Sequence, residues 1–252
     1  MKPARKLCAL LVVLCLPALA AEAGKKQAIR GFGPPITAGV VKRTLPNGLR
    51  VLVLPRRTAP VVTTMMWYRV GSRDELPGAT GLAHFLEHLM FKGTRKLKKG
   101  EIDRLTYQNG GSNNAFTFND YTAYEFNLPK QSWKVALDIE ADRMRNCVFS
   151  DADFEAERQV VMEERRIGED DPAQQFGEQL NALTYVAHPY RNPVIGWMAD
   201  LKRVTRDEVY AFYRKYYRPS NATLVITGDV DPADAIAAAR TAFRNVPALP
   251  AP

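Results

Sequence analysis

The stretch TGLAHFLEHLMFKGT, residues 80–94, combines an apolar run of helix length with three side chains that are costly to bury, His84, Glu87 and His88. Residues four apart project from the same face of a helix, so the two imidazoles are predicted to lie side by side with the carboxylate next to them. Buried ionisable groups need partners. A chain with this helix in its core must therefore bring a further polar element against it.

These three side chains suit a divalent metal ion, and zinc in particular, because imidazole nitrogen and carboxylate oxygen are among its usual ligands. The order His-x-x-Glu-His is the reverse of the commoner His-Glu-x-x-His. A catalytic zinc site also needs a third protein ligand, an open position for water and a base for the water's proton. Glu87, one residue before His88, is well placed to be that base. The alternative interpretation is a pair of hydrogen-bonded structural histidines, His84 and His88, near a surface glutamate.

The third ligand is expected from the charged segment FEAERQVVMEERR. Glu157 and Glu164 are seven residues apart and would share one face of a helix. Glu155, Glu163 and the arginines of the segment are interpreted as its solvated side. Spacing alone does not choose between Glu157, Glu163 and Glu164.

Two other residues could carry metal or nucleophile chemistry, and both are interpreted as structural. His188 is the third histidine of the chain and lies in the proline-rich loop AHPYRNP, where it is the other candidate ligand. Cys147 is the only cysteine after residue 20, so a disulfide within the remaining chain and a cysteine metal cluster are not expected. A buried thiol is the usual state of such a lone cysteine.

Residues 1–20 have the layout of a secretory signal peptide, with a basic start, an apolar run and small residues at the end. The apolar run is short for a membrane span. We therefore predict cleavage after Ala20 and export to the periplasm or the medium, with no membrane attachment afterwards. The formal net charge is +8, but no dense block of lysine and arginine interleaves with aromatic residues, so nucleic-acid binding is not expected.

The order of periodic segments predicts a mixed fold. Strand patterns occupy residues 40–57 (a hairpin around Pro46-Asn47-Gly48), 59–72, 113–129 and 222–230. Helix patterns occupy residues 81–91, 98–111, 130–147, 150–169, 171–185, 205–217 and 231–246, with Ser150 or Asp151 and Thr205 as N-caps. This order favours an α+β fold with a mostly antiparallel sheet covered by helices. We expect an irregular lead-in at 21–40, one domain at 41–247, and the start of an interdomain linker at 248–252.

Three blocks, GLAHFLEHLMFKGT, NGGSNNAFTFNDYTAYEFNLP and ERQVVMEE, follow one another in this chain. Together they resemble the pitrilysin/insulinase family of zinc metallopeptidases, which carries the inverted His-x-x-Glu-His motif, and most of all its bacterial members similar to mitochondrial processing peptidase. The resemblance runs from about Val41 to Pro247. It implies the metallopeptidase domain fold of mitochondrial processing peptidase and a zinc-dependent endopeptidase.

The resemblance also implies roles for single residues. It places one Zn²⁺ per chain on His84 and His88 and makes Glu87 the general base. The family's third ligand is the second glutamate of a pair seven apart, about 76 residues after the second histidine, and Glu164 matches it. Glu157 then matches the family's accessory glutamate, which supports the metal site without being a primary ligand.

The segment Asn114, Ala115, Phe116 and Thr117 resembles the family's edge strand, onto which a peptide substrate adds as a further strand. The plainer interpretation is an ordinary hairpin with Phe116 buried. Family members usually contain two homologous domains, and this chain resembles only the first, metal-bearing one. The resemblance therefore implies a homologous second half, a partner subunit or a homodimer.

Two other functions are compatible with the motif. One is a binding or assembly subunit of the same fold without catalysis, which the complete set His84, Glu87, His88 and Glu164 argues against. The other is a different metal enzyme with the same motif, such as an S-ribosylhomocysteine lyase. Such lyases are shorter, cytosolic and without the long downstream glutamate helix, so the predicted signal peptide argues against them.

Overall fold

The computed structural model describes residues 37–252, of which Gly39–Pro252 form one compact unit. The predicted signal peptide and most of the predicted lead-in lie outside the described residues. The domain boundaries at residues 41 and 247 stay predictions. None of the helices in the described part of the chain combines the length and the apolar character that a membrane span requires.

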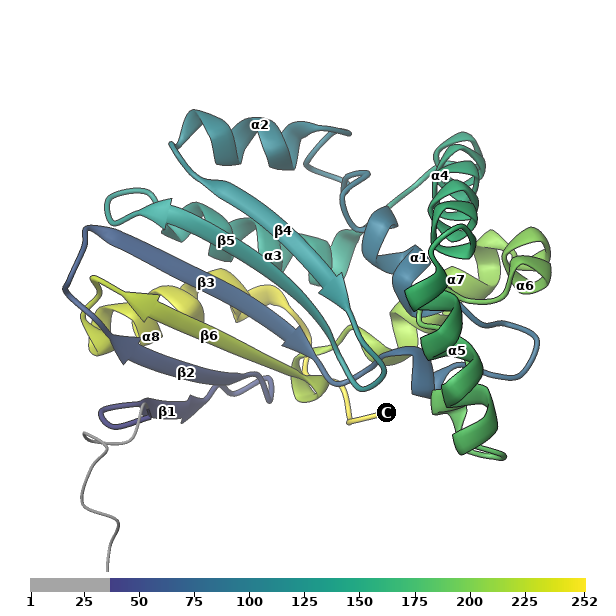
Figure 1. Ribbon diagram of the computed structural model, residues 1–252. Coiled ribbons are helices and arrows are strands. Elements are labelled where there is room, and N and C mark those ends of the chain that lie inside the picture. Colours follow the sequence, from purple (N-terminus) through teal and green to yellow (C-terminus); the bar gives the residue numbers. More distant parts are fainter. Residues whose placement is uncertain (1–36) are drawn as a thin grey trace, which may run out of the picture. The chain divides into compact units, whose positions relative to one another are not determined.

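Six strands form a single sheet in the order β1-β2-β6-β3-β5-β4 (Figure 1). Neighbouring strands are antiparallel except for β2 and β6. The predicted α+β class with a mostly antiparallel sheet is confirmed. The strands are Val41–Thr44 (β1), Arg50–Pro55 (β2), Val61–Tyr68 (β3), Ser112–Thr117 (β4), Thr122–Pro129 (β5) and Ala222–Gly228 (β6).

The strand β6 comes from the C-terminal part of the chain and yet lies in the interior of the sheet. Leu224 is opposite Val51 of β2 in a parallel register and opposite Met66 of β3 in an antiparallel one. The hairpin of β1 and β2 is therefore joined to the rest of the sheet only through β6. The strand pattern of residues 222–230 predicted the strand but not this position.

Eight α-helices accompany the sheet in residues 37–252. They are Leu82–Leu89 (α1), Glu101–Gln108 (α2), Lys134–Asn146 (α3), Asp151–Glu169 (α4), Pro172–Thr184 (α5), Met198–Arg203 (α6), Arg206–Tyr216 (α7) and Pro232–Ala242 (α8). Four short 3-10 helices are Ser72–Asp74 (η1), Pro189–Arg191 (η2), Pro219–Asn221 (η3) and Phe243–Asn245 (η4). The short helix α6 was not predicted from the sequence.

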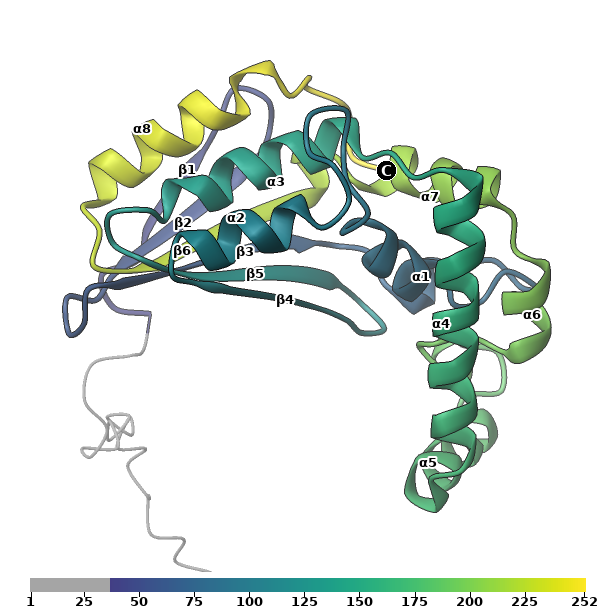
Figure 2. The ribbon, with the colours of Figure 1, turned by 90° about the horizontal axis from the view of Figure 1, so that it is seen from above.

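The two faces of the sheet differ. On β3, every second residue from Val62 to Tyr68 is buried, and the residues that alternate with them are partly exposed. The same alternation occurs on β5, where Tyr124 and Phe126 are buried. Figure 2 shows α2, α3 and α8 along one face only, and α1 with α4 beyond the ends of the strands. The main core therefore lies between one face of the sheet and these helices, and the opposite face is open.

A fully buried ion pair lies in this core. On α3, the Nε of Arg143 donates to Glu140 at 2.9 Å, and neither side chain is exposed. The guanidinium carbon of Arg143 lies 4.0 Å from the ring centre of Tyr124 and 5.4 Å from those of Phe91 and Phe126. Cation–π contacts of this kind add to the ion pair when both are desolvated. Arg143 therefore connects α3 to β5 and to the segment that follows α1.

We predict that Glu140→Ala destabilises the chain strongly, because it leaves the buried Arg143 charge without its partner. The free energy of unfolding should fall by about 3–5 kcal/mol in a urea titration. Glu163→Ala removes an exposed partner of Arg166, with the Glu163 side chain 61% exposed, and should cost less than about 0.5 kcal/mol. Equal effects of the two substitutions would contradict the role given to the buried pair.

Candidate metal centre

The start of α1 is fixed by Gly81 and Glu75. Gly81 has a φ of +90°, and a Cβ there would lie 2.5 Å from the carbonyl oxygen of Ile195. The buried carboxylate of Glu75 accepts the backbone N–H groups of Gly81 and Ala83 at 2.8 and 2.7 Å. Burial raises the pKa of Glu75 to about 8, and these two donors oppose the rise. The helix therefore starts at one defined point, which sets the direction of its side chains.

The helix α4 lies against α1 through an aromatic contact. Phe85 stacks on Phe154 with ring centres 4.9 Å apart. Ser150 caps α4 and accepts the N–H of Asp153 at 3.0 Å, which confirms one of the two N-caps predicted for this helix. The stacking of Phe85 on Phe154 places the inner face of α4 beside the polar face of α1.

The prediction of the solvated side of α4 is partly wrong. Glu155 and Glu163 are exposed as predicted. Arg158 and Arg165 are buried. Arg158 donates to the backbone carbonyls of Leu201 and Val204, and Arg165 pairs with Glu178 and Glu169. Long arginine stems can lie in apolar surroundings when the guanidinium finds acceptors, and these acceptors come from segments that the local pattern does not reveal.

Three candidate ligands converge between α1 and α4. Nε2 of His84 lies 3.8 Å, and Nε2 of His88 3.5 Å, from Oε2 of Glu164. One ligand atom from each residue lies within 4.8 Å of the others. Tetrahedral nitrogen and oxygen ligands of zinc lie about 3.3 Å from one another, so this donor set fits a zinc ion. The sequence prediction of His84 and His88 agrees with this geometry, and Glu164 rather than Glu157 or Glu163 completes the group.

The electrostatic state of the two histidines differs. Burial, and then the neighbouring His88, lower the pKa of His84 to about 3, so its imidazole is neutral and has a free lone pair. Burial acts to lower the pKa of His88, but the hydrogen bond to Glu157 and the charge of Glu164 raise it overall. Nδ1 of His88 lies 2.9 Å from Oε1 of Glu157, whose other oxygen is paired with Lys92. Glu157 therefore orients His88 through the nitrogen that does not face Glu164.

The carboxylate of Glu87 is buried and held by β4. Oγ1 of Thr117 donates to Oε2 of Glu87 at 2.5 Å. Burial raises the pKa of Glu87, whereas the Thr117 hydrogen bond and His88 lower it. Glu87 is therefore kept beside the candidate metal ligands by a residue of the predicted substrate strand.

The strand β4 is an edge of the sheet. The N–H of Phe118 donates to the carbonyl of Tyr121 at 2.8 Å, next to the pair Thr117 and Thr122. Ladder bonds in an antiparallel pair alternate along each strand. Asn114 and Phe116 therefore bond toward β5, and the backbone groups of Ala115 and Thr117 face the free edge.

The expectation of a buried Phe116 is not met. Its side chain is only partly buried, and its ring centre lies 5.6 Å from that of Trp67 on the open face of the sheet. The reason is the register, since Phe116 is opposite Ala123, whose side chain points away from the helices.

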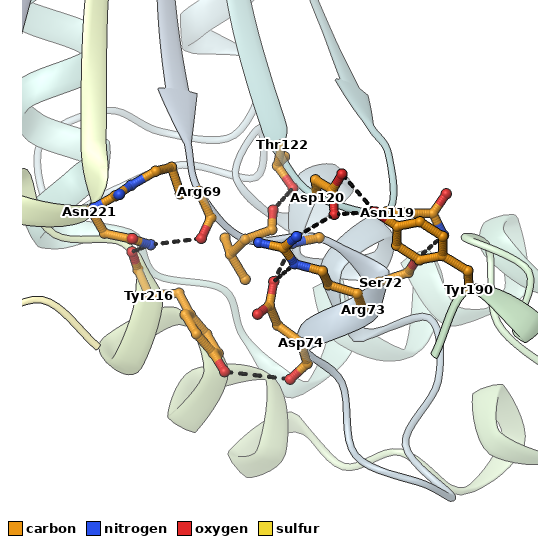
Figure 3. A network of polar contacts seen from close by, with 12 residues as sticks. Arg69, Ser72, Arg73, Asp74, Asn119, Asp120, Thr122, Tyr190, Tyr216 and Asn221 are labelled. Atoms are coloured by element: carbon orange, nitrogen blue, oxygen red, sulfur yellow. Dashed lines mark hydrogen bonds and ion pairs between the residues drawn. The ribbon is translucent and has the colours of Figure 1, made fainter. Parts of the chain in front are cut away.

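The turn between β4 and β5 is held by three residues, Arg73, Asp120 and Tyr190, here called the turn clamp (Figure 3). Asp120 accepts from Nη1 of Arg73 at 2.6 Å and from the hydroxyl of Tyr190 at 2.7 Å. Asn119 of the same turn donates to the hydroxyl of Ser72 at 3.0 Å. The turn clamp therefore joins the end of the hairpin to η1, which leads into α1, and to η2, which follows α5.

A cavity of about 430 Å³ lies beside His84. It is lined by His84, Thr117, Asn119, Gln174, Gly177, Glu178, Asn181, Asn192, Pro193, Val194 and Ile195. The charge of Glu178 is offset by its ion pair with Arg165. The space next to the candidate metal ligands therefore combines amide groups with the apolar side chains of Pro193, Val194 and Ile195.

The remaining candidates take structural positions. His188 caps η2, where its Nδ1 accepts the N–H of Tyr190, and it is not part of the candidate ligand group. Cys147 is buried, and burial raises the pKa of its thiol to about 12, so it is unreactive. Lys92 and Glu75 were missed in the sequence. The spacing of Lys92, four residues after His88, is the one local signal that could have pointed to it.

Family models and similar proteins both relate this chain to zinc peptidases. Residues 50–197 match the family model described as insulinase, peptidase family M16, and residues 203–252 match the model described as peptidase M16 inactive domain. A zinc protease, PqqE, of Helicobacter pylori is 38% identical over 190 residues, which are 75% of this chain and 43% of that protein. An uncharacterized zinc protease of Mycobacterium leprae is 35% identical over 207 residues, covering 82% and 46% of the two chains.

Solved structures agree with these relatives. The crystal structure of a protease from Helicobacter pylori superposes with a TM-score of 0.79 at 34% identity and covers 84% of this chain and 51% of that one. The periplasmic protease PqqL of Escherichia coli gives a TM-score of 0.79 at 27% identity, over 84% of this chain and 24% of its own. The chain thus spans less than half the length of the curated relatives described above.

We predict that Glu164→Ala lowers zinc affinity far more than Glu163→Ala. Loss of a residue that only orients a ligand typically costs 10- to 100-fold in affinity, so loss of a ligand should cost about 100-fold or more. Glu163 is the matched control, because it is adjacent on α4 and its side chain is exposed. Competition titration with a chelator measures both affinities, and full zinc retention in Glu164→Ala would place the third ligand elsewhere.

Proposed function

We propose, on the premise that the chain belongs to the insulinase family of peptidases, family M16, that it is the metal-bearing half of a zinc-dependent endopeptidase. The observation that carries the proposal is the convergence of His84, His88 and Glu164 on one point, with the buried carboxylate of Glu87 beside them. Two imidazoles and one carboxylate are three ligands, so they leave the fourth position of a tetrahedral zinc site open, as in catalytic zinc sites.

Zinc held by His84, His88 and Glu164 would act as a Lewis acid that lowers the pKa of water and polarises a carbonyl group. The chain's own residues do the rest. Glu157 holds the ring of His88 in place through Nδ1. Glu87 takes the proton of the attacking water on its carboxylate and then delivers it to the leaving amine of the peptide.

The substrate in this proposal is an extended peptide added to the free edge of β4. Its main chain pairs with the outward backbone groups of Ala115 and Thr117, as in other cases of strand addition. The cavity beside His84 lies within reach of this strand, since Thr117 lines both.

We further propose that a complete enzyme needs a homologous second half, a partner subunit or a second copy of the chain. The support is that the chain corresponds to less than half of its relatives. Export to the periplasm is part of the proposal, supported by the layout of residues 1–20 and by the periplasmic location stated for PqqL.

A binding or assembly subunit without catalysis is the second candidate. One observation favours it, the match of residues 203–252 to a model described as an inactive domain. That segment lies outside the candidate metal centre, where His84, His88 and Glu164 converge with Glu87 beside them. A lyase with the same motif has no such support, because the relatives are named zinc proteases.

We predict that Glu87→Gln keeps zinc but loses hydrolysis. The amide cannot take a proton from water, so turnover of a mixed peptide library should fall by about 10²- to 10⁴-fold. Zinc content is the control, since Glu87 is not one of the three candidate ligands. Residual turnover at the wild-type rate would remove Glu87 as the base. An inactive wild type with zinc bound would mean that the chain needs its second half or a partner, and inactivity with the second half supplied would support the non-catalytic candidate.

We predict that Ala115→Pro weakens binding of a peptide to the Glu87→Gln chain. Proline removes the outward N–H of residue 115 and leaves the pairing of β4 with β5 intact, since a proline is tolerated where the N–H faces away from the sheet. Ala115→Ser keeps the N–H and is the matched control. Fluorescence anisotropy of a labelled peptide measures the change, and equal affinities for the two variants would contradict strand addition at this edge.

A further inference from the structure

We propose that Thr117 is a positioning residue for Glu87, so that β4 holds the base with a side chain and the peptide with its main chain. This inference rests on the proposed function and deepens it. It gives Thr117 a role that differs from the substrate contact expected from the sequence.

The hydrogen bond itself is strong and directed. Oγ1 of Thr117 lies 2.5 Å from Oε2 of Glu87, at the short end of the range for a hydroxyl that donates to a carboxylate. The other neighbour of this hydroxyl, Oγ1 of Thr122, is 3.4 Å away and has its own acceptor, the carbonyl of Val70, at 3.1 Å. The hydroxyl of Thr117 therefore donates its hydrogen bond to Glu87 and not to Thr122.

Thr117 can do this because of its register. It is opposite Thr122, which is fully buried, so both side chains point to the helix-covered side of the sheet, at the end of the strands next to α1 (Figure 2). The N–H and carbonyl of the same residue face the free edge of β4. Thr117 thus contacts the base with its side chain and would pair with the peptide through its main chain. This one residue therefore sets the distance between Glu87 and a peptide strand added to β4.

The turn clamp keeps this residue in place. Asp120 of the turn clamp lies only three residues beyond Thr117. It is bonded to Arg73 in η1 and to Tyr190 in η2 (Figure 3). Gly71 makes the approach possible, because a Cβ there would lie 2.2 Å from the carbonyl oxygen of Phe118. The end of β4 is therefore held against the segment that leads into the helix of Glu87.

The first test compares Thr117→Val with Thr117→Ser in the full chain. Valine keeps the shape and strand preference of threonine and removes the donor, whereas serine keeps the donor. Thr117→Val should lower kcat by about 10- to 100-fold, the typical cost of a misplaced catalytic group, with KM and zinc content unchanged. Thr117→Ser should restore kcat. Thr63→Val is the matched control and should leave kcat unchanged, since Thr63 donates at 2.6 Å to Asn127 on the same sheet.

The second test is independent of turnover and of metal. In the zinc-free chain, Thr117→Val should lower the melting temperature by about 4–8 °C, because it leaves a buried carboxylate without its donor. The same substitution in a Glu87→Ala background should have a clearly smaller effect, as expected for two residues in contact. If the full chain has no turnover of its own, this comparison decides the proposal.

Several results would overturn the inference while leaving the proposed function in place. The first is an unchanged kcat in Thr117→Val when the wild type is active and Glu87→Gln is inactive. The second is a failure of Thr117→Ser to restore kcat. The third is an equal melting shift from Thr117→Val in the wild-type and Glu87→Ala backgrounds. Loss of zinc in Thr117→Val would also overturn it, because the residue would then support the metal ligands instead of the base.

Discussion

The contact between α1 and α4 is the interaction on which the candidate centre depends. Neither helix holds all the ligands, since His84 and His88 come from one and Glu164 from the other. The stacking of Phe85 on Phe154 joins the two helices on their apolar sides, and the polar groups meet beside this contact. Burial of aromatic surface therefore supplies the free energy that brings together carboxylates, which repel one another, and histidines, whose burial is unfavourable.

Much of the fold follows from local sequence patterns, and the parts that do not share one cause. The hairpins and helices were predictable because their signals, such as Asn47-Gly48 and the Ser150 cap, lie within the elements themselves. The interior position of β6 was not, because pairing of Leu224 with both Val51 and Met66 is a choice between distant partners. The helix α6 has only six residues, fewer than two helical turns, so its sequence carries no repeating pattern that predicts a helix.

The site divides in the same way. The spacing of His84 and His88 on one helix face predicts their proximity directly, whereas the choice of Glu164 over Glu163 required the family resemblance and was then supported by the distances. The bond from Thr117 to Glu87 crosses from a strand to a helix, and the burial of Arg158 depends on carbonyls far along the chain. Contacts of this kind leave no periodic signal in a single sequence.

The insertion of β6 has a consequence for the order of folding. The first strands and the histidine helix are synthesised early, but the sheet stays in two pieces until residues 222–228 enter between β2 and β3. Pairings with such a long sequence separation close late and slowly. The ribosome must therefore release nearly the whole described chain before the scaffold beneath the histidine helix is complete. The sheet beneath the candidate ligands is thus completed only by a strand that follows all three of them in the chain.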